Sequence, residues 1–256
     1  MINSIQKFRS KLAEGQLCLG TGITLNDPCV VEALAAVVDF VWIDMEHCPM
    51  GIETLLGHLV AARAGGAPAI VRVPGSDVPF LKRVLDTGAE GIIVPQVRSA
   101  EEVRQVVDAC RYPPLGKRGW GPRRPSGFGQ LTQDEIVRDS NERLFVTAQI
   151  ECVEAVEELD DIVAIEGLDG LVVGPYDLSA SLGVLGQLDH PSVVDAIKKI
   201  IAAAHGAGMK VGFGDEANAE SSARWVKLGA DWIQCGCDFA YMTDFAKKLF
   251  SDIRAM

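Results

Sequence analysis

Short apolar runs alternate with longer amphipathic segments along the whole chain, and this alternation limits the possible folds more than any other feature. The runs are rich in Val and Ile, which is typical of strands buried on both faces. Strands that alternate with helices form a parallel sheet, because each helix returns the chain to the same end of the sheet. The predicted strands are Leu17 to Gly20, Asp39 to Asp44, Ala69 to Val73, Gly91 to Pro95, Leu144 to Glu151, Asp169 to Gly174, Met209 to Phe213 and Asp231 to Gly236.

Capping signals predict where several of the intervening helices begin. Asn26-Asp27-Pro28 opens one helix, Ser76 or Asp77 caps another that ends before Gly88, and Ser99 with Glu102 has the spacing of a capping box. Further helices are expected over Ile5 to Ala13, Glu53 to Ala64, Pro191 to His205 and Asp238 to Arg254.

One connection is longer than this pattern allows. The segment Arg111 to Arg143 predicts a long loop between the fourth helix of the repeat and the fifth strand, and loops of that size are usually functional or mobile. Its first part, RYPPLGKRGWGPRRPSGFG, carries basic residues and no acidic one. We interpret it either as a positive patch that faces a carboxylate substrate or a neighbouring subunit, or as a solvated surface loop.

Eight strands in strict alternation with helices predict a single α/β domain over residues 1–256. The expected fold is a closed (β/α)8 TIM barrel with an N-terminal helix, and 256 residues match the usual size of that fold. An open, doubly wound sheet is the alternative, but no GxGxxG motif follows the first strand.

Composition excludes several classes of partner. The formal net charge of −11 would repel phosphate backbones, so we expect no nucleic-acid partner, and no apolar run approaches the length of a membrane span. The seven scattered cysteines are typical of a reducing, cytoplasmic location. Cys235 and Cys237 share a face of one strand, and we interpret them as small buried residues, because nothing nearby completes a zinc site.

Two carboxylates follow neighbouring predicted strands. Glu151 ends the fifth strand and Asp177 lies just after the sixth, so both side chains would project into the same mouth of the barrel. Carboxylates completed by waters and a substrate suit a hard cation such as Mg²⁺ or Mn²⁺. Alternatively, Glu151 begins an acidic helix and Asp177 caps a turn, but two such residues together favour the metal site.

A basic side chain and an imidazole follow two other strands. Arg72 ends the third strand after Ile70 and Val71, so it needs a counter-ion, either a substrate carboxylate or enolate or a structural carboxylate such as Asp44. His47 follows the second strand and could serve as a general base oriented by a carboxylate, or it could be structural.

Lysine is placed wrongly for Schiff-base chemistry. Lys210 is the only lysine in a predicted strand, and it lies at the beginning of that strand, away from the expected active face. The seventh strand is followed by the acidic sequence GFGDE, which would repel phosphate at a position where many barrels bind it.

Six segments in this order give the chain a resemblance to a known family. They are DFVWIDMEHCPM, VRVPGSD, LKRVLDTGAEGIIVPQVRSAEE, RYPPLGKRGWG, AQIE and EGLDGLVVGPYDLSASLG. Together they resemble the HpcH/HpaI family of metal-dependent pyruvate aldolases from about Leu17 to Cys237, and the combination of YPPxGxRG with GPxDLS is specific.

The resemblance implies a role for each matching residue. It implies that Glu151 and Asp177 bind a divalent metal ion (Mg²⁺, Mn²⁺ or Co²⁺), that His47 is the acid/base, and that Arg72 holds the oxo oxygen and the developing enolate. Acidic supporting positions fall on Asp44 and Asp86. The substrate would contact Arg72, Gln149, Gly174, Pro175, Tyr176 and Asp177, with backbone amides near Tyr176 and Asp177 receiving its carboxylate. A homo-oligomer, commonly a hexamer built as a trimer of dimers, is also implied.

The expected reaction is reversible retro-aldol cleavage of a 4-hydroxy-2-oxo acid to pyruvate and an aldehyde. Two alternatives stay open: another enolate reaction, such as oxaloacetate decarboxylation or cleavage of a CoA thioester like malyl-CoA, and a non-catalytic binding subunit. The chain departs from the family's usual pattern at Cys18, at Pro122-Arg123-Arg124 and at GFGDEAN after the seventh strand. These segments line the aldehyde side in the family, so the acceptor aldehyde is left open.

Overall fold

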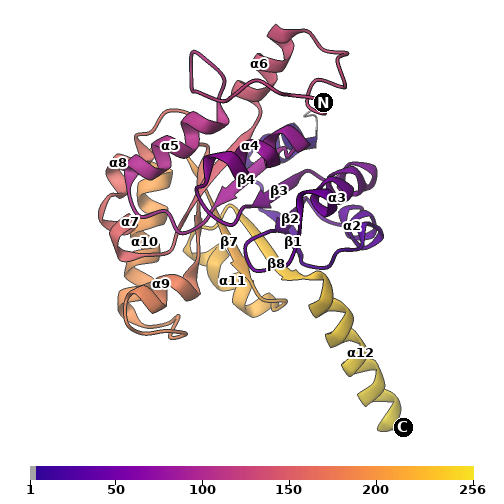
Figure 1. Cartoon of the computed structure of the whole chain (residues 1–256). Coiled ribbons are helices and arrows are strands. Elements are labelled where there is room, and N and C mark those ends of the chain that lie inside the picture. The colour runs from indigo at the N-terminus through magenta and orange to yellow at the C-terminus, as the bar shows by residue number, and fades with distance from the viewer. Residues whose placement is uncertain (1–3) are drawn as a thin grey trace.

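The computed structural model describes residues 4–256 and contains a closed barrel of eight parallel strands in the order of the sequence. Helices surround the barrel and connect its strands (Figure 1). The (β/α)8 prediction is therefore confirmed. The strands are β1 (Cys18–Ile23), β2 (Phe40–Asp44), β3 (Ala69–Arg72), β4 (Gly91–Val94), β5 (Phe145–Ile150), β6 (Gly170–Val173), β7 (Lys210–Asp215) and β8 (Trp232–Cys237).

The predicted helices are present with shifts of a few residues at their ends. They are α1 (Ser4–Ala13), α2 (Pro28–Ala35), α3 (Ile52–Gly65), α4 (Val78–Thr87), α5 (Ala100–Cys110), α10 (Pro191–Gly206) and α12 (Asp238–Arg254). Asp27 and Asp77 cap α2 and α4 as expected. Ser99 caps α5, but Glu102 accepts a hydrogen bond from the Arg98 N–H at 2.7 Å, outside the expected reciprocal pattern.

The long loop prediction was wrong in its second half, because α6 (Gln133–Glu142) lies within it. Thr132 and Glu135 form a complete capping box, and Ile136 is buried on the inner face of the helix. The T-x-x-E spacing was a readable signal of this helix. Four helices that were not predicted from the sequence complete the fold, namely α7 (Val153–Glu157), α8 (Leu159–Val163), α9 (Pro175–Ser181) and α11 (Ala219–Leu228).

The N-terminal helix closes one end of the barrel. Phe8 of α1 makes edge-to-face contacts with Phe40, Phe145 and Trp232, with ring centroids 5.3 to 5.9 Å apart. The large rings fit because glycines face them: a Cβ at Gly212 would lie 2.2 Å from the Trp232 ring. This aromatic cluster fills the barrel interior at the end where the strands begin, so the interior of the barrel is left to open at the other end, where the strands finish.

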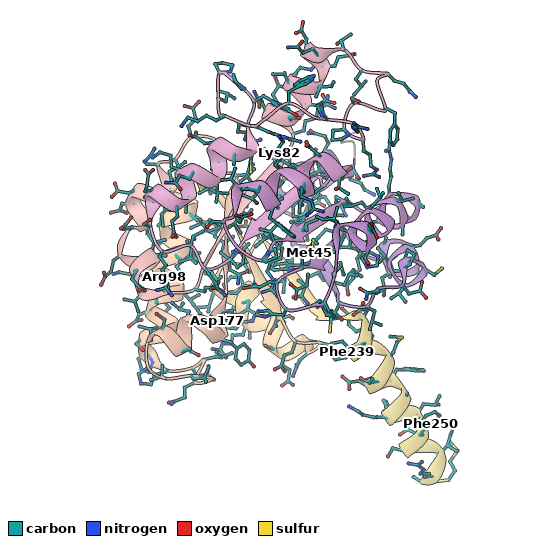
Figure 2. The ribbon with its side chains drawn as sticks, in the orientation of Figure 1. Met45, Lys82, Arg98, Asp177, Phe239 and Phe250 are labelled. Atoms are coloured by element: carbon teal, nitrogen blue, oxygen red, sulfur yellow. The ribbon has the colours of Figure 1, made fainter. Side chains whose placement is uncertain are left out.

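The C-terminal helix does not cover the barrel. Figure 1 shows α12 extending away from the rest of the molecule, and Figure 2 shows Phe239 and Phe250 along it. Met242, Phe245, Leu249 and Ile253 are spaced by three or four residues and so share one face, on which each side chain is at least 41% exposed. An amphipathic helix normally buries such a face against another surface. In residues 4–256, no helix is both apolar enough and long enough to cross a membrane.

Candidate active site

Alternation along the strands decides which side chains enter the barrel. Residues 146, 148 and 150 of β5 join the core between barrel and helices, whereas Phe145 joins the interior cluster. Because side chains alternate between the two faces of a strand, Thr147, Gln149 and then Glu151 also point inward. The same alternation along β2 and β3 carries Asp44 and Arg72 into the mouth, two residues after Trp42 and Ile70 of the interior cluster.

Arg72 and Asp44 form a bidentate ion pair across two adjacent strands. They are register partners in the β2–β3 ladder, and Arg72 Nε and Nη2 donate to the two Asp44 oxygens at 3.0 and 2.7 Å. Burial raises the pKa of Asp44, but the hydrogen bonds and charge of Arg72 outweigh it, and the net pKa lies below its ordinary value. The arginine side chain, largely buried, is thus fixed in its charged form beneath the cavity.

Glu46 is a second acidic neighbour of this arginine. Its Oε2 lies 3.2 Å from Arg72 Nη1 and 3.6 Å from His47 Nε2, and the Gln96 amide donates to its Oε1 at 3.1 Å. Burial raises the pKa of Glu46 in spite of the Arg72 charge. The His47 side chain is 63% exposed, and Asp44 accepts from its backbone N–H at 3.4 Å rather than from its imidazole. Glu46, and not Asp44, is therefore placed to orient this imidazole.

Glu151 is held rigidly at the end of β5. It is 4% exposed; its Oε1 accepts the Gln96 backbone N–H at 2.6 Å, and its Oε2 accepts from the Gln149 amide. Burial raises the pKa of Glu151, and the negative charges of Asp177 and Glu46 add to this. A Cβ at Gly174 would lie 2.4 Å from Glu151 Oε2, so only glycine leaves room for the carboxylate. A buried carboxylate without a cationic hydrogen-bond partner suits a site for a positive ion.

Asp177 lies on the first turn of α9, directly after β6, and it is exposed at the rim (Figure 2). Its negative charge contributes to the raised pKa of Glu151. Within residues 4–256 no group of three or more His, Cys, Asp and Glu residues could hold a metal ion. Glu151 and Asp177 could offer a cation two carboxylates, which would suit an ion that keeps water or substrate oxygens as its remaining ligands.

A cavity of about 650 Å³ opens above these residues. It is lined by Arg72, Gln149, Gly174, Pro175, Tyr176 and Asp177, all of which the family resemblance assigned to the substrate, together with residues from the ends of β7 and β8 and the start of α12. Gln149 Oε1 is buried and has no hydrogen-bond partner among residues 4–256. A buried amide oxygen without a partner is costly, and a donor carried by a ligand or its water would satisfy it.

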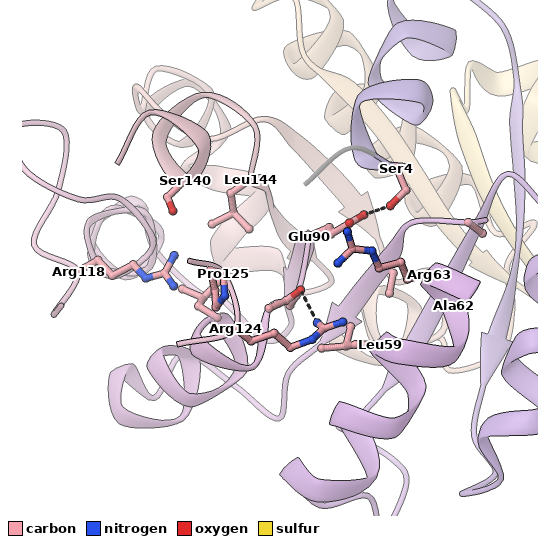
Figure 3. Close-up of a pocket in the computed structure, with 15 residues that line it drawn as sticks. Ser4, Leu59, Ala62, Arg63, Glu90, Arg118, Arg124, Pro125, Ser140 and Leu144 are labelled. Carbon is pink, nitrogen blue, oxygen red and sulfur yellow. Dashed lines mark hydrogen bonds between the residues drawn. The ribbon is translucent and has the colours of Figure 1, made fainter. Parts of the chain in front are cut away.

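Another cavity lies at the opposite end of the strands, next to the beginnings of β3 and β4 (Figure 3). Its volume is about 30 Å³, room for about one water molecule. Ser4 donates to Glu90 there, burial raises the pKa of that carboxyl, and Arg124 donates to the Thr87 carbonyl. This end of a barrel serves stability, so we do not place catalysis there.

Four assigned residues do not line the large cavity, namely Asp44 and Glu151, which bond to the lining residues Arg72 and Gln149, and Asp86 and His47, which lie farther away. Asp86 lies near the end of α4 and pairs with buried Arg118 at 3.1 Å. His47 lies beside Glu46 at the rim, outside the cavity lining. The long basic loop makes its contacts away from the large cavity. Arg111 is buried and donates to Asp169 and to backbone carbonyls, including that of Gly167 at 2.7 Å. None of the loop's basic residues lines the large cavity.

Several residues of the site were missed by sequence reasoning. Gln96 follows β4 after Pro95 and has a φ of 57°, while Gln234 lies two residues beyond Trp232 on the inward face of β8. Gln96 could have been found, because a polar residue at or just beyond the end of a barrel strand is the signal that identified Glu151, and Gln234 could have been found as a polar residue within an apolar strand. Glu216 lines the cavity from the loop after β7, where only its charge had been considered.

Comparison with known proteins gives concordant matches. The family model described as HpcH/HpaI aldolase/citrate lyase matches residues 23–243. The hydroxypyruvate/pyruvate aldolase of Roseobacter denitrificans is 34% identical over 250 residues, 96% of each chain. The 5-keto-4-deoxy-D-glucarate aldolase of Escherichia coli is 36% identical over 247 residues, 95% of this chain and 94% of the relative. The crystal structure of an HpcH/HpaI aldolase from Desulfitobacterium hafniense superimposes with a TM-score of 0.89 at 35% identity, covering 97% of this chain and 96% of that one.

Proposed function

Because the chain belongs to the HpcH/HpaI aldolase/citrate lyase family, we propose that it cleaves a 4-hydroxy-2-oxo acid reversibly to pyruvate and an aldehyde. The observation that carries this proposal is the pairing of Arg72 with Asp44 beside the buried Glu151, at one mouth of the barrel. A fixed positive charge next to a cation site is what a developing enolate requires.

A divalent metal ion, Mg²⁺, Mn²⁺ or Co²⁺, is the proposed cofactor, and Glu151 and Asp177 would hold it. The residues fit such an ion, since glycine at 174 leaves room for the Glu151 carboxylate and, within residues 4–256, no cationic group donates a hydrogen bond to it. When bound, the ion supplies Lewis-acid stabilisation of negative charge on the substrate oxygens.

The protein's own residues would divide the remaining work. Arg72, kept charged and immobile by Asp44 and Glu46, donates to the oxo oxygen as the electrons of the breaking C3–C4 bond move onto the pyruvate enolate. Backbone N–H groups of Tyr176 and Asp177, in the first turn of α9, receive the carboxylate. The His47 imidazole beside Glu46 takes the proton of the C4 hydroxyl, the aldehyde leaves, and return of a proton to C3 of the enolate gives pyruvate. Asp86 is proposed to support the site from its pair with Arg118.

Pyruvate release from a panel of 4-hydroxy-2-oxo acids, with and without EDTA, tests this function. Oxaloacetate and malyl-CoA belong in the panel, since both would proceed through a related enolate. We expect pyruvate from the hydroxy-oxo acids, lost on chelation and restored by added divalent metal. Turnover that survives complete removal of metal would contradict the scheme. Malyl-CoA would give acetyl-CoA and glyoxylate instead of pyruvate, so glyoxylate is measured for this substrate, and turnover of malyl-CoA alone would replace the scheme with C–C cleavage of a CoA thioester.

We also propose a cytoplasmic homo-oligomer, a hexamer built as a trimer of dimers, with no nucleic-acid or membrane partner. The exposed apolar face of α12 supports the oligomer, because a second copy of the chain would bury it. All seven cysteines are free thiols, which supports a reducing location.

A further inference from the structure

The cavity has two chemically different sides. Arg72 ends β3, and Asp215 ends β7, four strands away in a closed barrel of eight, so they lie on opposite sides of the mouth. Arg72 and Gln149 belong to the side assigned above to the oxo acid. Asp215 and Glu216 line the opposite side, and Asp244 of α12 adds a third carboxylate to the lining.

No positive charge of the described residues balances these three carboxylates inside the cavity. Arg72 is the only Lys or Arg in the lining, and Asp44 and Glu46 already neutralise it. A cation on Glu151 and Asp177 would offset those two carboxylates and leave the charges of Asp215, Glu216 and Asp244. An aldehyde that carries a carboxylate or phosphate would therefore approach a wall of its own sign.

Hydrogen bonds fix this wall in place. Ser221 and Ser222 of α11 donate to the two oxygens of Asp215 at 2.7 and 2.9 Å. Tyr176 Oη donates to Glu216 Oε1 at 2.9 Å, which links the start of α9, just after β6, to the loop after β7. Glu216 Oε2 has no such bond among the described residues, so it is free to accept from a ligand hydroxyl.

A ligand is expected between the two sides for an independent reason. Gln149 is 3% exposed and lines the same cavity, and no group in the described part of the chain bonds to its Oε1. The volume of about 650 Å³ also exceeds what pyruvate alone would occupy.

We propose that the acceptor is a small uncharged hydroxyaldehyde, and that Asp215, Glu216 and Asp244 disfavour anionic aldehydes. Glu216, oriented by Tyr176, accepts a hydrogen bond from a hydroxyl of the aldehyde. This inference rests on the proposed aldolase function and narrows it to one chemical class of acceptor.

A matched pair of aldehydes tests the inference. Glyceraldehyde and tartronate semialdehyde have the same three carbons and differ in a terminal hydroxymethyl or carboxylate. We expect kcat/KM for addition of pyruvate, with Mg²⁺ or Mn²⁺ present, to favour glyceraldehyde about tenfold or more. The preference should weaken as ionic strength rises.

Variants show which residue is responsible for the preference between the two aldehydes. Glu216→Gln should raise kcat/KM for tartronate semialdehyde and reduce the preference several-fold. The control Glu220→Gln removes the same charge from an exposed position on α11 that does not line the cavity, and it should leave the preference unchanged. Tyr176→Phe keeps the Glu216 charge but frees its side chain, so glyceraldehyde should become a poorer acceptor while the anion stays disfavoured.

Exchange of the pyruvate methyl protons in D₂O separates this inference from the proposed function, since it needs enolate formation but no aldehyde. If exchange occurs and the wild type adds pyruvate to tartronate semialdehyde as well as or better than to glyceraldehyde, the acceptor inference is wrong and the aldolase proposal stands. Equal effects of Glu216→Gln and Glu220→Gln on the preference would also overturn it. Absence of both exchange and addition would overturn both proposals.

Discussion

The backbone N–H of Gln96 donates to Oε1 of Glu151 at 2.6 Å, and Gln96 makes this contact with a φ of 57°. A non-glycine residue in the left-handed region costs roughly 1–3 kcal/mol and persists only where its surroundings hold it. Here the strained turn after β4 supplies the N–H that fixes the buried carboxylate after β5.

Substitutions at Gln96 should show how much the left-handed backbone at this position costs in unfolding free energy. Gln96→Gly relieves the left-handed strain but adds entropy to the unfolded chain, so we expect a change in unfolding free energy within about 1 kcal/mol. Gln96→Val places a β-branched residue at the same φ and should be less stable than the glycine variant by about 1–2 kcal/mol. Urea unfolding measures both; equal stabilities would show that the turn relaxes.

Gly174→Ala should disable the site without unfolding the barrel. Its Cβ would lie 2.4 Å from Glu151 Oε2, so the carboxylate must move, and a displacement of about 1 Å can cost roughly 100-fold in kcat/KM. Gly57→Ala is the control, because its Cβ would meet only Pro28 at 3.9 Å. Steady-state kinetics with circular dichroism checks the pair; near-normal turnover by Gly174→Ala would count against the role of Glu151.

Arg72→Lys keeps the positive charge and removes the fork that binds both Asp44 oxygens. We expect kcat/KM for pyruvate release to fall about 100- to 1,000-fold, the range for loss of a preorganised donor. Rates close to wild type would show that a point charge suffices and that the bidentate geometry is not required.

His58 should make stability depend on pH. It is fully buried on α3, its Nε2 lies 3.0 Å from the Leu25 carbonyl, and burial lowers its pKa from the ordinary 6.5. As the pH falls, the unfolded chain binds the proton before the folded chain does, so stability is full above pH 6.5 and is lost as the pH falls through the folded pKa.

The non-titrating variant His58→Gln, whose amide can still donate to the Leu25 carbonyl, isolates this contribution. Urea unfolding between about pH 7.5 and pH 5 should show a smaller loss of stability in the variant than in the wild type. Identical slopes would mean that His58 takes up its proton without cost in the folded state.

The apolar stripe of α12 gives a test of assembly. Phe245→Glu with Leu249→Glu places two charges on a face that a second copy would bury, and we expect the oligomer to dissociate toward smaller species. Val37→Glu, at a side chain 78% exposed outside α12, is the control. Sedimentation velocity measures the change; an unaltered assembly would place the interface elsewhere.

Local chemistry determined much of this protein. The alternation of apolar runs and caps predicted eight strands in order, because periodicity and capping depend on neighbours within a few residues. The polar residues at the ends of strands, Glu151, Arg72 and Asp44, were identified for the same reason, since a charge at the end of a buried strand needs a partner or a use.

Only the tertiary structure decided which of those groups meet. Register between β2 and β3 aligns Asp44 with Arg72, and the turn after β4 brings Gln96 to Glu151, 55 residues away. Asp86 faces Arg118 across α4 and the inserted segment, and the acidic wall at Glu216 forms only when the loops after β6 and β7 are neighbours. These contacts depend on strand register and barrel closure, which are set by long-range packing and are not encoded in any short stretch of sequence.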